Sequence, residues 1–227
     1  MFYYMARHGK MVGRTVKTLL LGLIMFIIVG NLAILGANLF ARAALESPPV
    51  PELDGVANLA AVNDDLWRGG APTDTGLREL ADHGVRTIVD LRAEEDIERD
   101  QELYDRLGLD LVPIPMRDGQ APRPHEVEEF LSVMENSKKR VFVHCGAGVG
   151  RTGTMAAAYL VETGEASPTQ ALGRNLSVGP PSLEQLSFVA ELSNGEGESP
   201  PVAITLMSRV IDGPRRIWVN ITSAYSH

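Results

Sequence analysis

A long uncharged stretch dominates the hydrophobic pattern at the beginning of this chain. Thr18 to Ala41 contains no charged side chain, and roughly 20 apolar residues are enough to cross a bilayer as a helix. The apolar residues do not gather on one face, as they would on a helix packed against a core. We therefore expect a transmembrane helix at residues 18–41. A signal peptide cleaved near Ala41-Arg42-Ala43 is the alternative, and a buried core helix is a third interpretation.

Charges on the two sides of this helix predict its orientation. Arg7, Lys10, Arg14 and Lys17 precede it without any acidic residue, whereas acidic residues follow soon after it. Basic flanking segments stay in the cytoplasm. We therefore expect residues 1–17 to be cytoplasmic and everything after the span to be extracytoplasmic.

Beyond the apolar stretch, segments with strand-like and helix-like patterns alternate. β-branched and apolar runs predict strands, and apolar residues spaced by three or four predict helices. The expected strands are residues 66–68, 85–91, 109–114 and 140–144, and the expected helices are residues 73–83, 94–107, 124–136, 151–163, 168–175 and 182–192. Such alternation is typical of an α/β fold with a mainly parallel sheet, here of four to five strands, flanked by helices on both faces. Sites in such sheets form beyond the carboxyl ends of the strands.

Segments rich in proline and glycine divide the chain. Residues 42–52 contain SPPVP and are expected to form a linker after the span, and residues 53–194 are expected to form one compact domain. Residues 195–227 begin with a second linker and end in an amphipathic tail, which either lies along a membrane surface or packs back on the domain. Pro214 is expected to interrupt any single helix there.

The charge of the chain limits the classes of partner that it is expected to bind. The sequence has 21 Lys and Arg against 29 Asp and Glu, of which five basic residues and one acidic residue lie in residues 1–46. The remaining 16 basic and 28 acidic residues give the rest of the chain a net charge of −12. We therefore expect it to bind neither nucleic acid nor anionic surfaces in general. The five histidines do not cluster, and no metal site is expected.

The single cysteine of the chain stands at the start of a glycine-rich loop, in the stretch VFVHCGAGVGRTGTMAAAYLV (residues 141–161). Glycines at 146, 148 and 150 permit conformations in which successive N–H groups turn inward and bind an anion. A helix beginning near Arg151 adds the positive end of its dipole, and the guanidinium of Arg151 adds donors suited to a tetrahedral oxyanion. The same field favours the thiolate of Cys145, which is the nucleophilic form.

Three alternative roles for this loop fit its residues less well. A buried structural cysteine would account for Cys145 alone, but not for the three glycines and the arginine after it. A nucleotide-binding loop requires G-x-x-x-x-G-K-[ST], and no lysine follows Arg140. A redox thiol would need a resolving cysteine, which this chain lacks. We therefore predict that Cys145 is a nucleophile beneath a phosphate-binding loop made of Gly146, Ala147, Gly148, Val149, Gly150 and Thr152.

The stretch HCGAGVGRTG fits the H-C-x5-R-[ST] signature of the cysteine-dependent protein phosphatases. With DLR upstream and GPPSLEQLSFV downstream, the chain resembles the small atypical dual-specificity phosphatases over about residues 66–192. This resemblance implies a parallel sheet flanked by helices, hydrolysis of phosphate monoesters through a phosphocysteine intermediate, and no metal or other cofactor.

Such chemistry needs an acid that protonates the leaving oxygen and later a base that activates water. The loop PIPMRDGQAPRP (residues 113–124) lies between an expected strand and an expected helix, and Asp118 is its only acidic residue. We expect Asp118 to be the general acid. Asp110 is the reserve candidate, and a turn-forming Asp-Gly is the structural alternative. The loop lacks the Trp-Pro-Asp of phosphotyrosine-specific members, so strict tyrosine specificity is not expected.

Three residues near the motif are expected to support the reaction. His144 would order the loop through hydrogen bonds rather than exchange protons with the substrate. Thr152 would donate its hydroxyl to the sulfur and help it leave in the second step. Gln185 would help to position water.

Charged residues at neighbouring loops are open to two interpretations. Asp90 and Arg92 end an expected strand, where the pattern fits either a structural ion pair or a substrate contact. Arg117 and Arg123 flank Asp118 and either attract anions or are solvated loop charges. The segment WRGGAPT (residues 67–73) is interpreted as packing and turn.

Together these features predict a membrane-anchored phosphatase whose substrate is a phosphoprotein. A phospholipid or lipid-linked phosphate is the alternative, because a membrane anchor would hold the enzyme beside it. A non-catalytic module that captures phosphorylated partners would keep the loop and lose the chemistry. The joint presence of Cys145, Arg151, Thr152 and Asp118 argues against that module.

Overall fold

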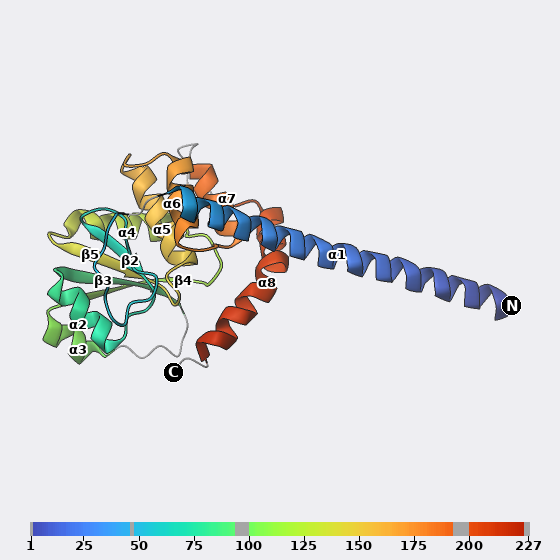
Figure 1. The fold of residues 1–227 in the computed structure, drawn as a ribbon, viewed down its shortest axis with the longest axis horizontal. Helices are drawn as coiled ribbons and strands as arrows, with labels where there is room; N and C mark the ends of the chain where they lie inside the picture. The colour runs from blue at the N-terminus through green and yellow to red at the C-terminus, as the bar shows by residue number, and fades with distance from the viewer. Residues whose placement is uncertain (1, 46–47, 94–99, 193–199, 225–227) are drawn as a thin grey trace.

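In the computed structural model, which describes residues 2–45, 48–93, 100–192 and 200–224, a sheet lies between two layers of helices and one long helix projects from this body (Figure 1). In chain order the elements are α1 (Phe2–Ala44), β1 (Ala60–Ala61), β2 (Leu66–Gly69), α2 (Asp74–Asp82), β3 (Val85–Arg92), α3 (Gln101–Leu107), β4 (Asp110–Met116), α4 (Pro124–Asn136), β5 (Arg140–His144), α5 (Gly150–Glu162), α6 (Pro168–Val178), α7 (Leu183–Glu191) and α8 (Val202–Ala224).

The sheet of the described residues has five strands in the order β1-β2-β5-β3-β4. All neighbouring strands are parallel except β1 and β2. The central strand, β5, is apolar on both faces, which is typical of the interior of a parallel sheet. The expected mainly parallel α/β sheet is therefore confirmed, and β1 adds a short antiparallel strand at one edge.

Alternate side chains of β5 belong to two separate cores. Val141 and Val143 lie in the core beneath α4, α5 and α7, whereas Phe142 lies in the core beneath α2 and α3. Fully burying one such side chain stabilises the fold by about 1.5–3 kcal/mol. The central strand is thus held from both faces, and the loop that follows it starts from a fixed point.

Helix α1 is the element that projects from the body in Figure 1. Its segment Thr15–Ala44 contains an 18-residue window with a mean hydropathy of 2.6 and is long and apolar enough to cross a membrane; a signal sequence would have the same properties. The last turns of α1 pack on α6 and α8 through Ile34, Asn38 and Ala41, which are all buried. The helix ends at Ala44, inside the segment expected to be a linker.

Two segments differ from their expected form. Pro214 lies inside α8, which continues from Val202 to Ala224, so the expectation that this proline interrupts the helix is wrong. A proline in a helix interior costs about 3 kcal/mol, and the packing of α8 on α7 and α1 holds the helix against that cost. Of the helix expected at residues 94–107, Gln101–Leu107 forms α3, and residues 94–99 lie outside the described residues.

Candidate active site

Four strands deliver their ends to one edge of the sheet. Cys145 follows β5, Gly70 follows β2, Arg92 ends β3, and Asp118 lies two residues after β4. These strands are parallel and in register, with His144 at the end of β5 opposite both Gly69 and Asp90. Their carboxyl ends therefore lie side by side, where α/β sheets form their sites.

The carbonyl groups of the glycine-rich loop are bound by the surrounding protein from Gly146 to Val149. Ala71 N donates to Gly146 O, and Asn58 Nδ2 donates to Ala147 O, both at 2.9 Å. Arg68 Nη2 donates to Gly148 O at 2.8 Å and to Val149 O at 3.3 Å. In a planar trans peptide, the N–H of the next residue points opposite to the carbonyl. The N–H groups of residues 147–150 therefore point away from these donors, toward the inside of the turn that begins at Cys145.

The turn depends on a glycine at one position. Gly148 has a φ of 74°, in the left-handed region that side chains disfavour. A Cβ at this residue would also collide with backbone atoms of Gly69 and Gly70 at the end of β2. The backbone of the loop at Gly148 therefore packs directly on the backbone at the end of β2, with no space for a side chain between them.

Helix α5 presents its N-terminus to the same turn. It begins at Gly150, and its N-cap residue, Val149, makes no side-chain hydrogen bond to the first helical turn. The N–H groups of an uncapped first turn are left to a ligand, and the helix dipole adds about half a positive charge there. Cys145, only 4% exposed, precedes this turn. The arrangement can hold an anion close to the sulfur.

The residues predicted as phosphate ligand and general acid lie next to each other. Arg151 Nε is 3.6 Å from Asp118 Oδ1. Arg151 is buried, and its Nη1 donates to the carbonyl of Met116 at 3.1 Å, just before the loop that carries Asp118. The Asp118 side chain is 42% exposed. The Asp118 carboxyl group is therefore more open to solvent than the Arg151 side chain beside it.

Arg68 is a site residue that the sequence alone did not identify. It is 4% exposed and holds the back of the loop through Gly148 and Val149. Burial lowers the pKa of Arg68 to about 10, and attraction to Cys145 acts in the opposite direction. Arg68 therefore remains cationic near neutral pH and places positive charge behind the sulfur. The available signal was an arginine within an apolar strand, since a buried charge is nearly always paired.

Thr152 and His144 flank the loop and are completely buried. Thr152 Oγ1 has no hydrogen-bond partner among the described residues, so the expected bond to sulfur is not formed in this structure. His144 Nδ1 lies 3.3 Å from Cys145 O and 3.9 Å from Asp90 Oδ1, and its ring stacks on Phe142. These contacts fit an ordering role for His144.

Asp90 and Arg92 form an ion pair at the end of β3. Arg92 Nε donates to Asp90 Oδ1 at 2.9 Å, and Arg92 Nη2 donates to Oδ2 at 3.0 Å. Burial raises the pKa of Asp90, but hydrogen bonds from Arg92 and the charge of His144 lower it more, so the pKa lies below its ordinary value. The structural interpretation of this pair therefore fits better than a substrate contact.

The loop that carries Asp118 is fastened to the first turn of α7. Two side chains of α7 or its N-cap donate to the loop: Ser182 Oγ to Gly119 O at 2.8 Å and Gln185 Nε2 to Gln120 O at 3.1 Å. In the other direction, Ala121 N of the loop donates to Glu184 Oε1 at 3.1 Å. Gln185 Oε1 also accepts from Ser182 N at 3.0 Å. The amide of Gln185 is thus engaged by the protein on both sides, which favours a role in holding the acid loop over the expected role in positioning water.

The other candidate residues from the sequence are Asp110, Arg117 and Arg123. Asp110 is exposed at the first residue of β4, opposite Thr87, so it lies at the amino edge of the sheet rather than beside Cys145. Arg123 pairs with Glu126 at 2.7 Å, and Arg117 is exposed. In the described part of the chain, no group of His, Cys, Asp and Glu could hold a metal ion.

Residues 51–191 match a family model described as "DSP-PTPase phosphatase fused to NAD+ Kinase". The chain belongs to this phosphatase family. The resemblance to cysteine-dependent phosphatases of the dual-specificity type is therefore confirmed, and the Cys145 loop is the part that carries their signature.

Curated relatives of this DSP-PTPase chain match it over short regions. NAD kinase 2, chloroplastic, of Arabidopsis thaliana is 40% identical over 100 residues, which are 41% of this chain and 10% of that protein. Dual specificity protein phosphatase CDC14B of Mus musculus is 35% identical over 89 residues, which are 39% of this chain and 18% of that protein. The chain therefore spans less than a fifth of either relative.

Solved structures of related phosphatases share the fold of this DSP-PTPase domain. Tk-PTP in its active form has a TM-score of 0.54 at 22% identity, covering 61% of this chain and 97% of that one. PTPMT1 in complex with PI(5)P has a TM-score of 0.53 at 20% identity, covering 60% and 95%. The catalytic core of the PP-IP phosphatase SIW14 from S. cerevisiae has a TM-score of 0.52 at 18% identity, covering 61% and 86%.

Proposed function

We propose that this protein is a membrane-anchored phosphatase that hydrolyses phosphate monoesters through a phosphocysteine intermediate. The observation that carries the proposal is the loop between Cys145 and Arg151, whose carbonyls are bound on one side so that its N–H groups converge on the other. Convergent N–H groups, a helix N-terminus and a guanidinium together match a tetrahedral dianion.

In the first step, the thiolate of Cys145 attacks phosphorus while the loop and Arg151 hold the three non-bridging oxygens. The sulfur–phosphorus bond forms and the bond to the leaving oxygen breaks. Asp118, beside Arg151 and open to solvent, gives its proton to that oxygen, so the product leaves as a neutral alcohol or phenol.

In the second step, water attacks the phosphocysteine. The Asp118 carboxylate takes a proton from this water, and the sulfur leaves as a thiolate. The buried hydroxyl of Thr152, which has no protein partner among the described residues, would donate a hydrogen bond to the departing sulfur. Inorganic phosphate is then released from the loop.

Trapping the intermediate tests this mechanism. The protein is mixed with para-nitrophenyl phosphate, quenched in acid within the first turnover, and digested for mass spectrometry. A phosphate adduct on the peptide that contains Cys145 supports the mechanism. Rapid turnover without any adduct, even in an Asp118→Asn variant that should slow the second step, would exclude it.

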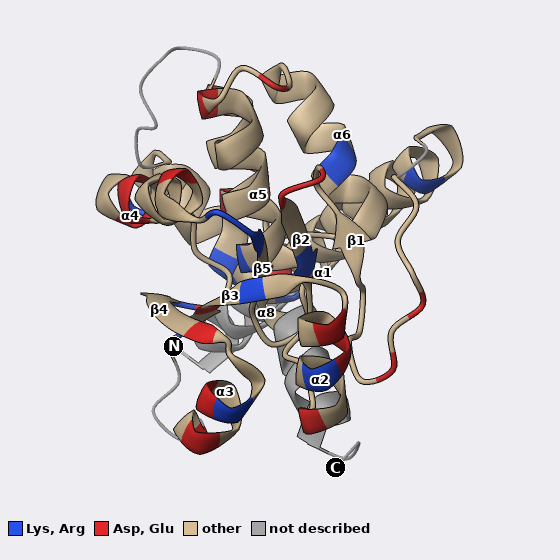
Figure 2. Ribbon diagram, turned by 90° about the vertical axis from the view of Figure 1, so that its left-hand side faces the viewer, with Lys and Arg blue, Asp and Glu red and all other residues tan. Residues whose placement is uncertain are grey.

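Membrane attachment is proposed from α1. Its exposed apolar side chains continue around the helix from Leu19 to Phe40. Acidic residues lie on α2, α3 and α4 (Figure 2), and α2 and α3 lie at the end of the body away from α1 in Figure 1. If α1 spans an anionic bilayer, these two helices lie far from its surface, where the repulsion between like charges is weakest. Protease protection of the domain in sealed vesicles tests whether it is extracytoplasmic, as the flanking charges predict.

The proposed substrate is a phosphoprotein carrying phosphate on Tyr or on Ser and Thr. The phosphatase signature and the absence of Trp-Pro-Asp in the acid loop support this dual specificity. Phosphotyrosine and phosphothreonine peptides of matched sequence, assayed side by side, would measure the preference directly.

A membrane lipid with a phosphate monoester is the second candidate, and α8 favours it. The apolar side chains of Val202, Leu206 and Val210 on this helix are exposed, from 43% to 76%. Helix α8 also binds the first turn of α7, because Asp212 Oδ2 accepts from Leu183 N at 3.0 Å. Since α7 holds the acid loop, the catalytic edge lies next to this apolar helix.

Substitution on α8 separates the two substrate classes. Leu206→Glu should lower turnover of a phosphatidylinositol monophosphate in phosphatidylcholine vesicles at least about tenfold, and leave turnover of a soluble phosphopeptide unchanged. Gln101→Glu, on α3, adds the same charge at the far end of the body and serves as the control. Equal rates of both variants on vesicles would remove the support that α8 gives to the lipid candidate, and no turnover of the lipid by the unchanged protein would remove the candidate itself.

A further inference from the structure

A second cavity lies behind the phosphate-binding loop. It has a volume of about 350 Å³ and is lined by residues of α5, α6, β1 and β2 and by Leu45, Pro48 and Pro49. A pocket of this size is in the range that binds small molecules, about 300–1,000 Å³. The cavity is not lined by Cys145, Arg151 or Asp118, so it is separate from the site at the Cys145 loop.

One end of the cavity is polar and deeply buried. Arg68 and Asn175, which line it, are 4% and 1% exposed. Arg68 Nε and both polar atoms of the Asn175 amide have no hydrogen-bond partner among the described residues. Leaving such a group unpaired costs about 1–3 kcal/mol, so a fold usually meets several of them at one place with ordered water or with a ligand.

The backbone makes room for this polar end. Gly153 lies in the interior of α5, and a Cβ there would collide with Asn175 Oδ1 and come within 2.8 Å of Arg68 Nη2. Glycine in a helix interior destabilises it by about 1 kcal/mol relative to alanine. The chain tolerates this cost at the residue that lets the Arg68 guanidinium and the Asn175 amide reach the same space.

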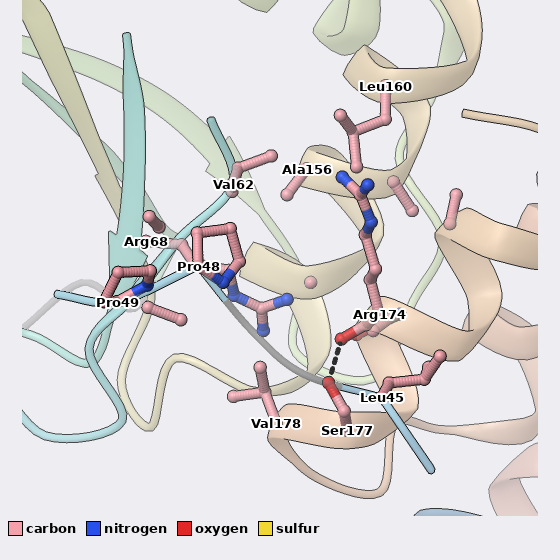
Figure 3. Close-up of a pocket in the computed structure, with 16 residues that line it drawn as sticks. Leu45, Pro48, Pro49, Val62, Arg68, Ala156, Leu160, Arg174, Ser177 and Val178 are labelled. Carbon is pink, nitrogen blue, oxygen red and sulfur yellow. Dashed lines mark hydrogen bonds between the residues drawn. The ribbon is translucent and has the colours of Figure 1, made fainter. Parts of the chain in front are cut away.

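The rest of the described lining is mostly apolar, and its charged residues are arginines. Figure 3 shows Arg68 and Arg174 entering from opposite sides, from β2 and from α6, with Pro48, Ala156 and Leu160 around them. Among the described residues, no acidic side chain lines the cavity. An anion with a short apolar body matches both the polar end and these walls.

We propose that this cavity is a second binding site, for a small amphiphilic anion whose carboxylate or phosphate group meets Arg68 and Asn175. Arg68 connects the two sites, because its Nη2 also holds Gly148 O and Val149 O of the catalytic loop. An anion in the cavity competes for this guanidinium and offsets the positive charge behind Cys145. Its binding should therefore inhibit catalysis without displacing the substrate.

The test uses hexylphosphonate, which cannot be hydrolysed as an ester, and the full chain in phosphatidylcholine nanodiscs. Calorimetry should show binding, and inorganic phosphate and hexanol should each bind at least about tenfold more weakly, because each keeps only half of the contacts. Turnover of para-nitrophenyl phosphate should fall in kcat with KM unchanged. Purely competitive inhibition would place the phosphonate in the catalytic loop and overturn the proposal.

Two variants locate the site. Asn175→Leu removes a proposed contact of the anion, and Arg174→Glu reverses a charge in the lining, so each should weaken hexylphosphonate binding about tenfold or more. Arg106→Glu, an exposed charge reversal on α3, is the control and should bind normally. Unchanged affinity in the Arg174 variant would contradict the proposal even if Asn175→Leu failed to fold. The calorimetric result stands whether or not the protein proves to be a phosphatase.

Discussion

Arg68 Nη2 donates a hydrogen bond to Gly148 O at 2.8 Å, and thereby ties the second strand of the sheet to the loop that follows the central strand. The same nitrogen reaches Val149 O. A lysine side chain is one bond shorter than an arginine side chain, so its ammonium would not extend to the position of Nη2 that serves both carbonyls.

The Arg68→Lys variant should therefore lose activity although it keeps its charge. Loss of one charge-assisted hydrogen bond costs about 1.5–3 kcal/mol, which corresponds to roughly a 10- to 150-fold fall in kcat/KM if it is expressed in the transition state. Steady-state kinetics on para-nitrophenyl phosphate measure this fall. Arg78→Lys, at an exposed position of α2, should match the wild type. Near-normal activity of Arg68→Lys would show that the charge alone suffices.

Asp118→Asn should separate good from poor leaving groups. A general acid contributes about 10²–10⁴-fold when the leaving oxygen needs a proton, so hydrolysis of an alkyl phosphate should fall by that factor. Release of para-nitrophenolate needs little protonation and should fall much less in the first step. Asp110→Asn, at the opposite edge of the sheet, is the matched control. A uniform effect on both substrates would assign the acid role elsewhere.

Gly148→Ala and Gly146→Ala form a matched pair within the loop. The φ of 74° at Gly148 and its contact with the β2 backbone leave no room for a methyl group, whereas a Cβ at Gly146 meets nothing within 4 Å. Left-handed backbone alone costs about 1–2 kcal/mol for alanine. We expect Gly148→Ala to lower the thermal midpoint and abolish turnover, and Gly146→Ala to retain the wild-type midpoint. Similar behaviour of the two variants would contradict the loop geometry.

The Asp90–Arg92 pair should set part of the acid stability. The pKa of Asp90 is held below its ordinary value of about 3.9, so its stabilising contribution is present above that pH. This contribution is lost as pH falls through the folded-state pKa. Arg92→Gln removes the main partner of a buried carboxylate and should cost about 3–5 kcal/mol at neutral pH. Circular dichroism during acid titration should show unfolding at a higher pH than in the wild type; an unchanged midpoint would argue that the pair is dispensable.

The segments with strong local periodicity could be predicted from the sequence alone. The limits of α4 and β5 coincide with their expected limits, because apolar spacing, Pro124 at the helix start and the run Val141–Val143 are local signals. The Cys145–Arg151 loop was visible for the same reason. All of its ingredients lie within a few residues of one another.

Features that depend on distant partners were not visible. Arg68 acquires its role only because β2 pairs with β5, which brings residues 80 positions apart into hydrogen-bonding distance. The helix through Pro214 is held by contacts with α7 and α1 that local propensity does not encode. Asp118 could be proposed from its loop, but its position beside Arg151 required the parallel order of β4, β3 and β5.

The base of α1 has a mechanical consequence. Asn31 Nδ2 donates to Ile211 O at 2.8 Å, and Arg42 donates to Ser177 O and Val178 O at 3.0 and 2.9 Å. The helix is therefore clamped to α8 and α6 instead of ending in a free tether. If α1 spans a bilayer, these contacts prevent the domain from rotating freely relative to the helix. The Cys145 loop would then keep a fixed distance and orientation relative to the membrane, so substrates would have to reach that position by lateral diffusion or by protruding far enough from the surface.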